Sequence, residues 1–435
     1  MGSRGRRRMT SYSETLHRIY NLRGGIIDLR LDRMQGALAL FGHPQDSFPS
    51  IHIAGTNGKG STAAMLHRIL SDAGHLTALY TSPHLVSFTE RIRVGDEEIT
   101  PDEVILIADD IWRKTAASNI PLTFFEFVTV MAFVYFAHRQ VAIAVIEVGL
   151  GGRLDATNVV TPIVSAITTL SKDHEAYLGP DELSIAREKG GIIKPDVPLV
   201  CGRFSDEILD LLRGIARERG SPVFSLGRNF NFFLKEDGLF DYRGIKRHFS
   251  NLQLSLRGRY QRANASVALA ALEIAQDRFP VGELVIRTGL KRVRWPGRLE
   301  VMGDRPTVIL DGAHNPEGTK ALVNELNDLR RGRKVKLLFA AMADKEWEIM
   351  LRVLAGAVDE ITLTKVNMER SADPELLAAK LNEPIVRRVI ADPSRALRVL
   401  VDEAEGRDEI IVIAGSLYLL GEVRPLLQKT APANP

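Results

Sequence analysis

The chain has 435 residues, which is too long for one ordinary hydrophobic core, so we expect two or three domains. Hydrophobic residues make up 45% and charged residues 26% of the chain, as in water-soluble globular proteins, and no apolar run approaches the roughly 20 residues needed to cross a membrane. With 57 basic against 54 acidic residues and one cysteine, the composition argues against a nucleic-acid partner and excludes a disulfide framework. We therefore expect a cytoplasmic protein without a membrane or nucleic-acid partner.

A basic arm opens the chain, and a helical region follows it. Four arginines stand among the first eight residues, but no apolar segment follows them, so the arm is not a secretory signal. We interpret it as a solvated tail, with nucleic-acid attachment as the less favoured alternative. Residues 11–45 mix polar and apolar side chains and are predicted to be helical.

The most informative segment is residues 51–61, which reads Ile-His-Ile-Ala-Gly-Thr-Asn-Gly-Lys-Gly-Ser. A short apolar run enters a glycine-rich turn, a lysine and a hydroxyl follow, and a helical pattern begins after Thr62. These are the parts of a phosphate-binding loop, in which backbone N–H groups and a helix N-terminus face the anion. The predicted nucleotide-binding residues are Gly55, Thr56, Asn57, Gly58, Lys59, Gly60 and Ser61.

The spacing of this loop differs from that of the common P-loop. Only Thr56 and Asn57 separate Gly55 from the Gly-Lys pair, and Gly60 stands before the hydroxyl of Ser61. A GTPase or an ordinary kinase is therefore disfavoured. The alternative is a plain turn between strand and helix, but such a turn has no need of a lysine and a hydroxyl at these positions.

Strand and helix patterns alternate beyond the loop. Apolar runs at Leu76–Tyr80, Val141–Val148 and Pro162–Leu170 are typical of buried strands, and the segments 101–117 and 124–138 between them are predicted to be helices. This alternation favours a mainly parallel sheet that is covered on both faces.

Polar residues stand where these strands end. Glu147 closes one strand, Ser82 follows another, and His174 follows the next. In open α/β sheets ligands bind at the carboxyl ends of the strands, and a buried acid is costly unless it is paired or bound to a metal. Glu147 is therefore a candidate Mg²⁺ ligand, with an ion pair to Arg153 or another base as the alternative. Ser82 could supply Mg²⁺ with a hydroxyl oxygen, and His174 is a second candidate ligand.

The pattern changes in the middle of the chain. Residues 222–258 hold short alternating runs that suggest antiparallel strands, and a helix, Asn264–Ala275, follows. The pair Pro296-Gly297 marks the predicted boundary between a first domain, 1–295, and a second domain, 296–435. Cys201 ends an apolar run and is predicted to be a buried structural thiol.

The second domain is predicted to be a small doubly wound α/β domain. Its strands are expected at Thr307–Leu310, Val335–Phe339, Glu360–Leu363, Pro384–Ile390 and Glu409–Ile413. Helix starts are readable at Thr100 in the first domain and at Ser371 and Asp392 in the second. The fold class is thus α/β: a P-loop ATPase domain with a mainly parallel sheet and a small antiparallel section, plus a C-terminal Rossmann-like domain.

Ten sequence blocks in order resemble the signatures of folylpolyglutamate synthases and dihydrofolate synthases, a branch of the Mur ligase superfamily. The blocks are Gly55 to Ser61, Ser82-Pro83-His84-Leu85 with Glu90-Arg91-Ile92, Phe125-Glu126, Glu147 to Asn158, Asp173-His174, Glu188 to Ile192, Arg259-Tyr260-Gln261 with Asn264-Ala265, Pro296 to Leu299, Leu310 to Pro316, and Gly415 to Tyr418. One departure is Gly190, where the family often has alanine after the lysine. This small change leaves the expected role of the lysine in place.

The resemblance implies ATP and two Mg²⁺ sites as cofactors. Lys59 and the loop amides would hold the β- and γ-phosphates, and Asn264, Arg298 and Asp311 would also contact ATP. Ser82 and Glu147 would bind one Mg²⁺ with Ser61 close by, and His174 would bind the second. Lys189 would be carbamoylated by CO₂ and become a carboxylate-like metal partner.

The resemblance also implies the substrates. His314 and Ser416 would position L-glutamate, and Phe125 and Asp155 would contact the pteridine side of dihydropteroate. The expected enzyme is an ATP-dependent carboxylate–amine ligase that adds L-glutamate to a folate, with dihydropteroate as the expected second acceptor. The substrate carboxylate attacks the γ-phosphate, and the glutamate amine then displaces phosphate from the acyl phosphate. Lys59, Glu147, His174 and Lys189 are the expected catalytic residues.

Three alternatives stay open. A Mur-type cell-wall ligase shares the loop and mechanism, but it normally carries an additional N-terminal domain, and only about 50 residues precede the loop here. The enzyme could extend folylpolyglutamates without making dihydrofolate. A non-catalytic nucleotide-binding regulator is disfavoured because it would not require the second set of metal ligands. We expect a monomer.

Overall fold

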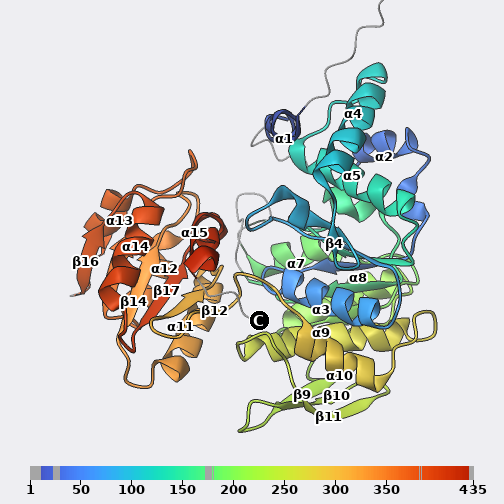
Figure 1. Ribbon diagram of the computed structural model, residues 1–435. Helices are drawn as coiled ribbons and strands as arrows, with labels where there is room; N and C mark the ends of the chain where they lie inside the picture. Colours follow the sequence, from blue (N-terminus) through green and yellow to red (C-terminus); the bar gives the residue numbers. More distant parts are fainter. Residues whose placement is uncertain are drawn as a thin grey trace, which may run out of the picture. The chain divides into compact units, whose positions relative to one another are not determined.

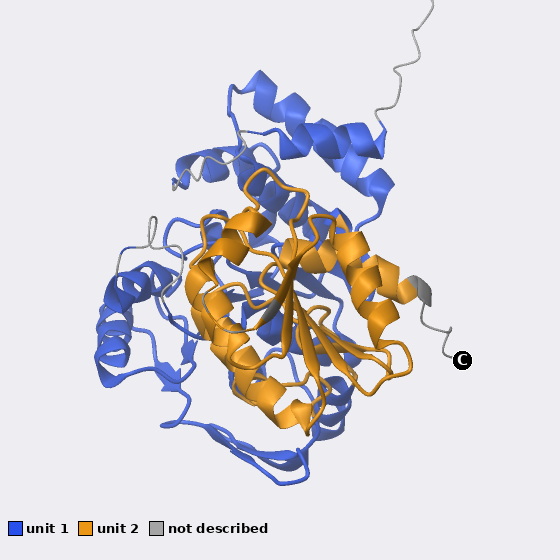
Figure 2. Ribbon diagram, turned by 90° about the vertical axis from the view of Figure 1, so that its left-hand side faces the viewer, with its two compact units in different colours: residues 1–84, 88–253, 264–291 blue, residues 85–87, 254–263, 292–435 orange. Residues whose placement is uncertain are grey.

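The computed structural model describes residues 11–22, 30–171, 179, 181–381, 383 and 385–430. The chain divides into two compact units, which Figure 2 distinguishes by colour. The first unit comprises residues 1–84, 88–253 and 264–291, and the second comprises 85–87, 254–263 and 292–435. The second unit therefore includes two short segments, and also residues 292–295, that precede residue 296, where the sequence places the domain boundary.

The described residues of the first unit form an eight-stranded sheet in the order β4-β3-β2-β5-β1-β6-β7-β8. The six strands from β2 to β8 in this order are parallel, and β3 and β4 form an antiparallel edge. The predicted mainly parallel sheet is confirmed. The strands are β1 Ser50–Ala54, β2 Thr77–Tyr80, β3 Ile92–Val94, β4 Glu97–Glu98, β5 Ile143–Glu147, β6 Val164–Ile167, β7 Leu199–Cys201 and β8 Val223–Ser225.

Helices cover both faces of this sheet (Figure 1). On one face, Tyr80 and Ile146 pack with α5, while Ala54 and Ile167 pack with α7 and α8. Because side chains alternate along a strand, the opposite face of β1, β2 and β5 is left to helix α3, which packs against these strands. The helices of this unit are α1 Tyr12–Tyr20, α2 Asp32–Ala39, α3 Lys59–Asp72, α4 Pro101–Ala117, α5 Phe124–His138, α7 Glu182–Gly190, α8 Asp206–Glu218 and α10 Glu283–Arg292, with α9 Tyr260–Ala275 beginning in the second unit.

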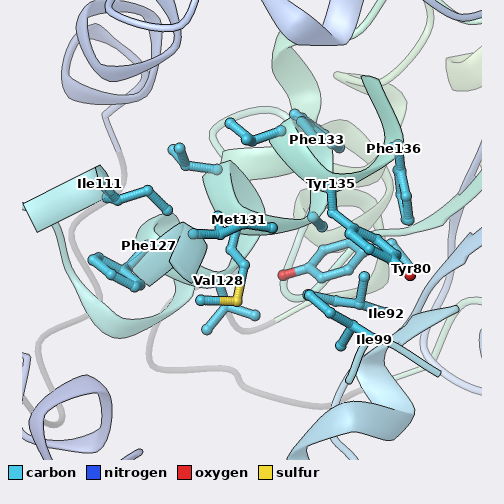
Figure 3. Close-up of a cluster of buried hydrophobic side chains, with 14 of the residues drawn as sticks. Tyr80, Ile92, Ile99, Ile111, Phe127, Val128, Met131, Phe133, Tyr135 and Phe136 are labelled. Carbon is cyan, nitrogen blue, oxygen red and sulfur yellow. The ribbon is translucent and has the colours of Figure 1, made fainter. Parts of the chain in front are cut away.

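Large aromatic and aliphatic side chains fill the core beneath α4 and α5, as Figure 3 shows. Helix α5 is apolar on nearly all sides because it is buried against both the sheet and its neighbouring helices. Capping boxes start α4 at Thr100 and α5 at Thr123, so the predicted cap at Thr100 is confirmed. Glu126 completes the second box and also forms an ion pair with Arg33, at 2.8 Å.

The middle segment contains both antiparallel and parallel strands. Strands β9 Asn231–Leu234, β10 Phe240–Arg243 and β11 His248–Leu252 form the antiparallel sheet that the alternating pattern predicts. Strand β8 lies in the same stretch of sequence but pairs in parallel with β7, so it extends the large sheet instead. Helix α9 begins at Tyr260, one turn before the predicted start at Asn264.

The second unit holds a six-stranded sheet in the order β12-β13-β17-β14-β15-β16, counted over its described residues. All neighbours are parallel except β12, an edge strand that the sequence patterns did not predict. The elements are β12 Glu300–Met302, β13 Thr307–Leu310, α11 Pro316–Arg330, β14 Val335–Phe339, α12 Trp347–Ala355, β15 Glu360–Leu363, α13 Pro374–Lys380, β16 Val386–Val389, α14 Pro393–Ala404, β17 Ile410–Ala414 and α15 Leu417–Thr430.

Two helix starts in this unit test the predicted caps. Asp392 caps α14 as predicted, but α13 is capped by Asp373, whose side chain accepts from the backbone N–H of Glu375, and not by Ser371.

Within the described part of the chain, no helix is both long and apolar enough to cross a membrane. Cys201 lies fully buried on β7, as predicted, and burial raises the pKa of its thiol.

Candidate active site

Four neighbouring strands of the first sheet carry the predicted site residues at their carboxyl ends. In the order β2-β5-β1-β6, Ser82 follows β2, Glu147 ends β5, the loop from Gly55 to Gly58 follows β1, and Thr168 follows β6. Parallel strands bring these ends to one edge of the sheet. The predicted loop, the predicted carboxylate and Ser82 therefore share one edge.

The loop after β1 is held by the strand next to it. The backbone N–H of Asn57 donates to Thr169 Oγ1 at 2.9 Å, and Thr168 Oγ1 donates to the carbonyl of Asn57 at 2.6 Å. The backbone N–H of Thr56 donates to the carbonyl of Thr169 at 2.9 Å. The sequence reasoning gave Thr168 and Thr169 no role, although two hydroxyl residues at the end of a strand beside a phosphate loop are a usable signal.

Glycine is required at the end of this loop. Gly58 has φ +85°, and a Cβ there would overlap the side-chain amide of Asn264, which lies on α9. Asn264 is buried, so the structure brings this predicted ATP contact directly against the loop.

Two lysines converge on one carbonyl of the loop. Lys59 Nζ donates to the carbonyl oxygen of Gly55 at 3.0 Å and to that of Thr56 at 3.2 Å. Lys189 Nζ donates to the same Gly55 oxygen at 3.1 Å, and this side chain is only 4% exposed. Two lysine side chains, and not one, thus bring positive charge to the phosphate loop. Both ammonium groups donate to the carbonyl of Gly55, the first residue of the loop.

A tightly packed loop fixes α7 and therefore Lys189. The backbone N–H of Arg153 donates to the carbonyl of Glu188 at 2.8 Å, and Asn158 Nδ2 donates to the carbonyl of Gly191 at 3.2 Å. A Cβ on Gly152 would stand 3.1 Å from the Cα of Lys189, so the glycine allows the close approach. Gly152 and Gly191 therefore allow the segments that carry them to pack closely beside Lys189.

Glu147 is a buried carboxylate at the centre of this edge. It is 5% exposed, and Oε2 accepts a hydrogen bond from the backbone N–H of Ser82 at 3.1 Å. The alternative that Arg153 neutralises Glu147 is wrong, because Arg153 forms an ion pair with Glu188 at 2.9 Å. Ser61 lies in the first turn of α3 and is buried.

Metal ligands other than these oxygens are scarce among the residues that the structure describes. No group of three or more His, Cys, Asp or Glu side chains gathers there as a ready metal site. His174, the predicted second ligand, lies outside the described residues. A divalent cation at this edge would depend on the hydroxyl and carboxylate oxygens of Ser61, Ser82 and Glu147, which are the hard donors that Mg²⁺ prefers.

The two predicted pteridine contacts both adjoin the glycine turn after β5. The ring of Phe125, in the first turn of α5, packs so closely on Gly149 that a Cβ there would overlap it. Asp155 is buried, and its oxygens accept from the backbone N–H groups of Leu150 at 2.9 Å and Thr157 at 3.0 Å. Burial raises the pKa of Asp155, while these hydrogen bonds oppose the rise.

The predicted residues of the second unit gather at the carboxyl end of its own sheet. Asp311 follows β13 and Ser416 follows β17, and these strands are parallel neighbours. The backbone N–H of Gly415 donates to the carbonyl of Ala313 at 3.0 Å, which joins the segments that carry His314 and Ser416. Ser416 is 2% exposed and accepts from the backbone N–H of Tyr418 at 3.2 Å.

Asp311 organises this second edge. It is 4% exposed, and it accepts from the backbone N–H groups of Leu299 and Ala313, both at 2.9 Å. Burial raises the pKa of Asp311, and the charge of Arg298 acts in the opposite direction. Tyr260 lies in one of the ten sequence blocks but was given no role there. It interacts with Asp311, and burial raises its own pKa.

His314 completes the set. Its Nδ1 lies 2.8 Å from the carbonyl oxygen of Gly312, and because a carbonyl only accepts, Nδ1 carries the proton. The structure thus brings together Arg298, Asp311, His314 and Ser416 within the second unit, and the phosphate loop, Ser82, Glu147, Lys189 and Asn264 within the first.

Comparison with known proteins places this geometry in a family. Residues 53–272 match the family model of the Mur ligase middle domain, and residues 297–417 match that of the Mur ligase glutamate ligase domain. The chain is 32% identical to the dihydrofolate synthase/folylpolyglutamate synthase of Bacillus subtilis, over 92% of this chain and 95% of the relative. It is 34% identical to the folylpolyglutamate synthase of Lacticaseibacillus casei, over 91% of this chain and 94% of the relative.

Comparison with solved structures indicates the same family. Escherichia coli FolC in complex with DHPP and ADP is similar with a TM-score of 0.89 and 31% identity, covering 96% of this chain and 98% of that one. The folylpolyglutamate synthase of Thermotoga maritima is similar with a TM-score of 0.85 and 36% identity, covering 97% and 98%. The chain therefore belongs to the Mur ligase superfamily and, within it, to the family of folylpolyglutamate synthases and dihydrofolate synthases.

Proposed function

We propose that this chain is an ATP-dependent ligase that adds L-glutamate both to a reduced folate and to dihydropteroate. The observation that carries the proposal is the convergence of Lys59 and Lys189 on the Gly55 carbonyl, beside the buried carboxylate of Glu147. The ammonium group of Lys59 at a glycine loop favours the binding of a polyphosphate. The buried lysine and the acid at the same edge favour a metal-bound one, once Lys189 is carbamoylated.

The reaction has to activate a carboxylate, which is a poor electrophile. The substrate carboxylate attacks the γ-phosphorus of ATP, the bond to the bridging oxygen breaks, and ADP leaves an acyl phosphate behind. The neutral amine of glutamate then attacks the acyl carbon, loses a proton, and displaces inorganic phosphate. In this proposal Lys59 exchanges its loop carbonyls for phosphate oxygens and neutralises charge that develops during transfer.

Mg²⁺ would be held by Ser82 and Glu147, with Ser61 close by, and by His174 and a modified Lys189 at a second position. The bound ion would stabilise phosphoryl charge. The hydroxyl and carboxylate oxygens fit this cation, whereas a lysine ammonium does not. Carbamoylation of Lys189 would convert one of two adjacent cations into an anion, which removes their repulsion and supplies an oxygen ligand.

The remaining residues are assigned by their place in the two units. Asn264, Arg298 and Asp311 would contact ATP. His314 and Ser416 would position L-glutamate, and Phe125 and Asp155 would contact the pteridine. We propose the division 1–295 and 296–435 as the functional division between ATP binding and glutamate ligation, and a monomer as the active form.

A paired assay tests the proposal. ADP release is measured with glutamate plus dihydropteroate, tetrahydrofolate or a UDP-muramoyl peptide, each with and without glutamate. Glutamate-dependent release with both folates is the expected result. Glutamate-dependent ADP release with tetrahydrofolate alone would exclude dihydrofolate synthase activity. Release with the UDP-muramoyl peptide alone would indicate a cell-wall ligase. ADP release that depends on none of the acceptors would refute ligation.

A further inference from the structure

A histidine stands inside the apolar strand that leads into the phosphate loop. His52 lies on β1, its side chain is fully buried, and its Nε2 lies 2.8 Å from the hydroxyl oxygen of Thr157. Thr157 is also fully buried and belongs to the segment that follows β5. The contact therefore links the strand before the ATP loop to the proposed pteridine side.

The hydrogen bonds of this pair have a defined direction. Thr157 Oγ1 donates its single proton to Asp155 Oδ1, so it can only accept from His52, and the histidine proton is on Nε2. His52 Nδ1 has no hydrogen-bond partner among the residues that the structure describes. Burial and the charge of Lys194 lower the pKa of His52 to about 3, so the ring is neutral near pH 7.

The carboxylate of Asp155 ends this chain of hydrogen bonds and is held by its own segment. Asp155 accepts from the backbone N–H groups of Leu150 and Thr157 and from the hydroxyl of Thr157. A carboxylate has about four acceptor positions, so donors of this segment occupy most of them. Asp155 therefore shapes the segment 149–157, and Gly149 of that segment lies against the ring of Phe125.

We propose that His52 is a positioning residue for the pteridine subsite: through Thr157 and Asp155 it fixes the segment 149–157, and with it the surface formed by Gly149 and Phe125. His52 touches neither substrate nor ATP in this role. The inference rests on the proposed function, because it assigns the pteridine to this surface.

Four single variants and one double variant test this role. His52→Leu removes the donor, His52→Gln keeps an N–H at the position of Nε2, and Thr157→Val removes the link. His67→Gln is the matched control, because His67 is likewise a buried histidine with a ring nitrogen that lacks a partner among the described residues, but it lies on α3.

We expect His52→Leu and Thr157→Val to raise the KM for dihydropteroate about tenfold, as the loss of one buried hydrogen bond would, with the KM for ATP within about twofold of the parent value. His52→Gln should restore most of the loss. The double variant His52→Leu with Thr157→Val should be no worse than Thr157→Val alone, because both act through one chain of hydrogen bonds. An unchanged KM in both single variants, or an equal effect in His67→Gln, would overturn the proposal.

Hydrogen exchange separates this inference from the proposed function. Peptides that cover 149–158 should exchange faster in His52→Leu than in the parent, while peptides from β14 and β15 should not change. If the parent protein shows no glutamate-dependent turnover with any folate, the proposed function fails, and the exchange result still decides whether His52 holds the segment. If the parent is active and neither exchange nor KM responds, the positioning role alone is refuted.

Discussion

The two units present the carboxyl ends of parallel strands in different ways. In the first, the charged groups at the loop are lysines that hydrogen-bond to the loop's own carbonyl of Gly55. In the second, the acidic group is Asp311, which is buried and accepts from the backbone N–H groups of Leu299 and Ala313. An ammonium group on a neutral carbonyl can exchange that partner for an anion at little cost, whereas a buried carboxylate cannot leave its donors without a large penalty.

The comparison indicates that the charged groups at the first edge can exchange hydrogen-bond partners for a ligand, whereas Asp311 at the second edge holds the loops around it in one conformation. Substitutions at the first edge should therefore reduce turnover more than stability. Those at the second should reduce stability first. Four variants test this division, from the largest expected effect to the smallest.

Lys59→Met should produce the largest loss. We expect glutamate-dependent ADP formation to fall by about 10³-fold, because a preorganised group that stabilises developing phosphoryl charge is removed, with little change in the midpoint of thermal unfolding. The matched control is Lys114→Met, since Lys114 Nζ also donates to a backbone carbonyl, that of Leu40 at 3.2 Å, but on α4. A similar loss in both variants would mean that the loop lysine has no special part in turnover.

Lys189→Ala should lower ligation by about 10²-fold and abolish any response to bicarbonate, because the proposed carbamate can no longer form. Rates are measured at several bicarbonate concentrations in CO₂-depleted buffer. Lys194→Met serves as the control: Lys194 lies five residues further on, donates to the carbonyl of Asn158 at 2.7 Å, and should leave the bicarbonate response intact. Full activity in Lys189→Ala would remove the carbamate from the mechanism.

Asp311→Asn should act mainly on stability. An amide places an N–H₂ group against the backbone N–H of Leu299 or Ala313, so we expect a loss of about 1–3 kcal/mol in the free energy of unfolding, measured with urea. Because the folded-state pKa of Asp311 is raised above 3.8, its contribution is fully present below that value and decreases as pH rises through the folded pKa.

The loss caused by Asp311→Asn should consequently be larger at pH 4.5 than at pH 7.5. Urea unfolding at both pH values checks the sign. A loss that grows with pH would contradict the burial-dominated shift and would place Asp311 among the groups stabilised by their charge.

Gly190→Ala should have the smallest effect. The added methyl group would meet the side-chain ends of Ile215 at 2.9 Å and Leu212 at 3.2 Å, which can shift, so stability should change by less than about 1 kcal/mol and turnover by less than about twofold. Gly191→Ala offers the contrast, because the methyl group there would overlap the Cα of Arg153. Equal tolerance at both positions would show that the packing beside Lys189 is looser than the structure indicates.

Much of the fold follows from the sequence because its signals are local. The predicted strands Thr307–Leu310, Val335–Phe339 and Glu360–Leu363 have the same bounds in the structure, since continuous apolar runs mark buried parallel strands. Strands β8 and β12 were not predicted as parts of their sheets. Each has only three residues, which is too short for a recognisable hydrophobic pattern, and pairing with β7 or β13 depends on the tertiary fold. The cap of α13 was misplaced because Ser371 and Asp373 are both good capping residues and geometry chooses between them.

For the candidate site, the sequence predicted which residues gather at the sheet edge but not how their side chains pair. Position at the ends of strands brought out Ser82, Glu147 and the loop, because topology alone gathers them. The partner of each charge was not predictable: Arg153 binds Glu188 and not Glu147, and Asp155 accepts hydrogen bonds from Leu150 and Thr157 of its own loop. Such choices depend on side-chain orientation within a few ångströms, which spacing along the chain does not record.

Cys201 gives this protein an experimental advantage. It is the only cysteine in the chain, it is fully buried on β7, and its raised pKa disfavours the reactive thiolate. The native chain should therefore resist thiol-directed dyes while folded. A cysteine introduced on the surface of each unit would then accept a donor or an acceptor fluorophore with little background. Energy transfer between such a pair would follow the two units during turnover without prior removal of a native thiol.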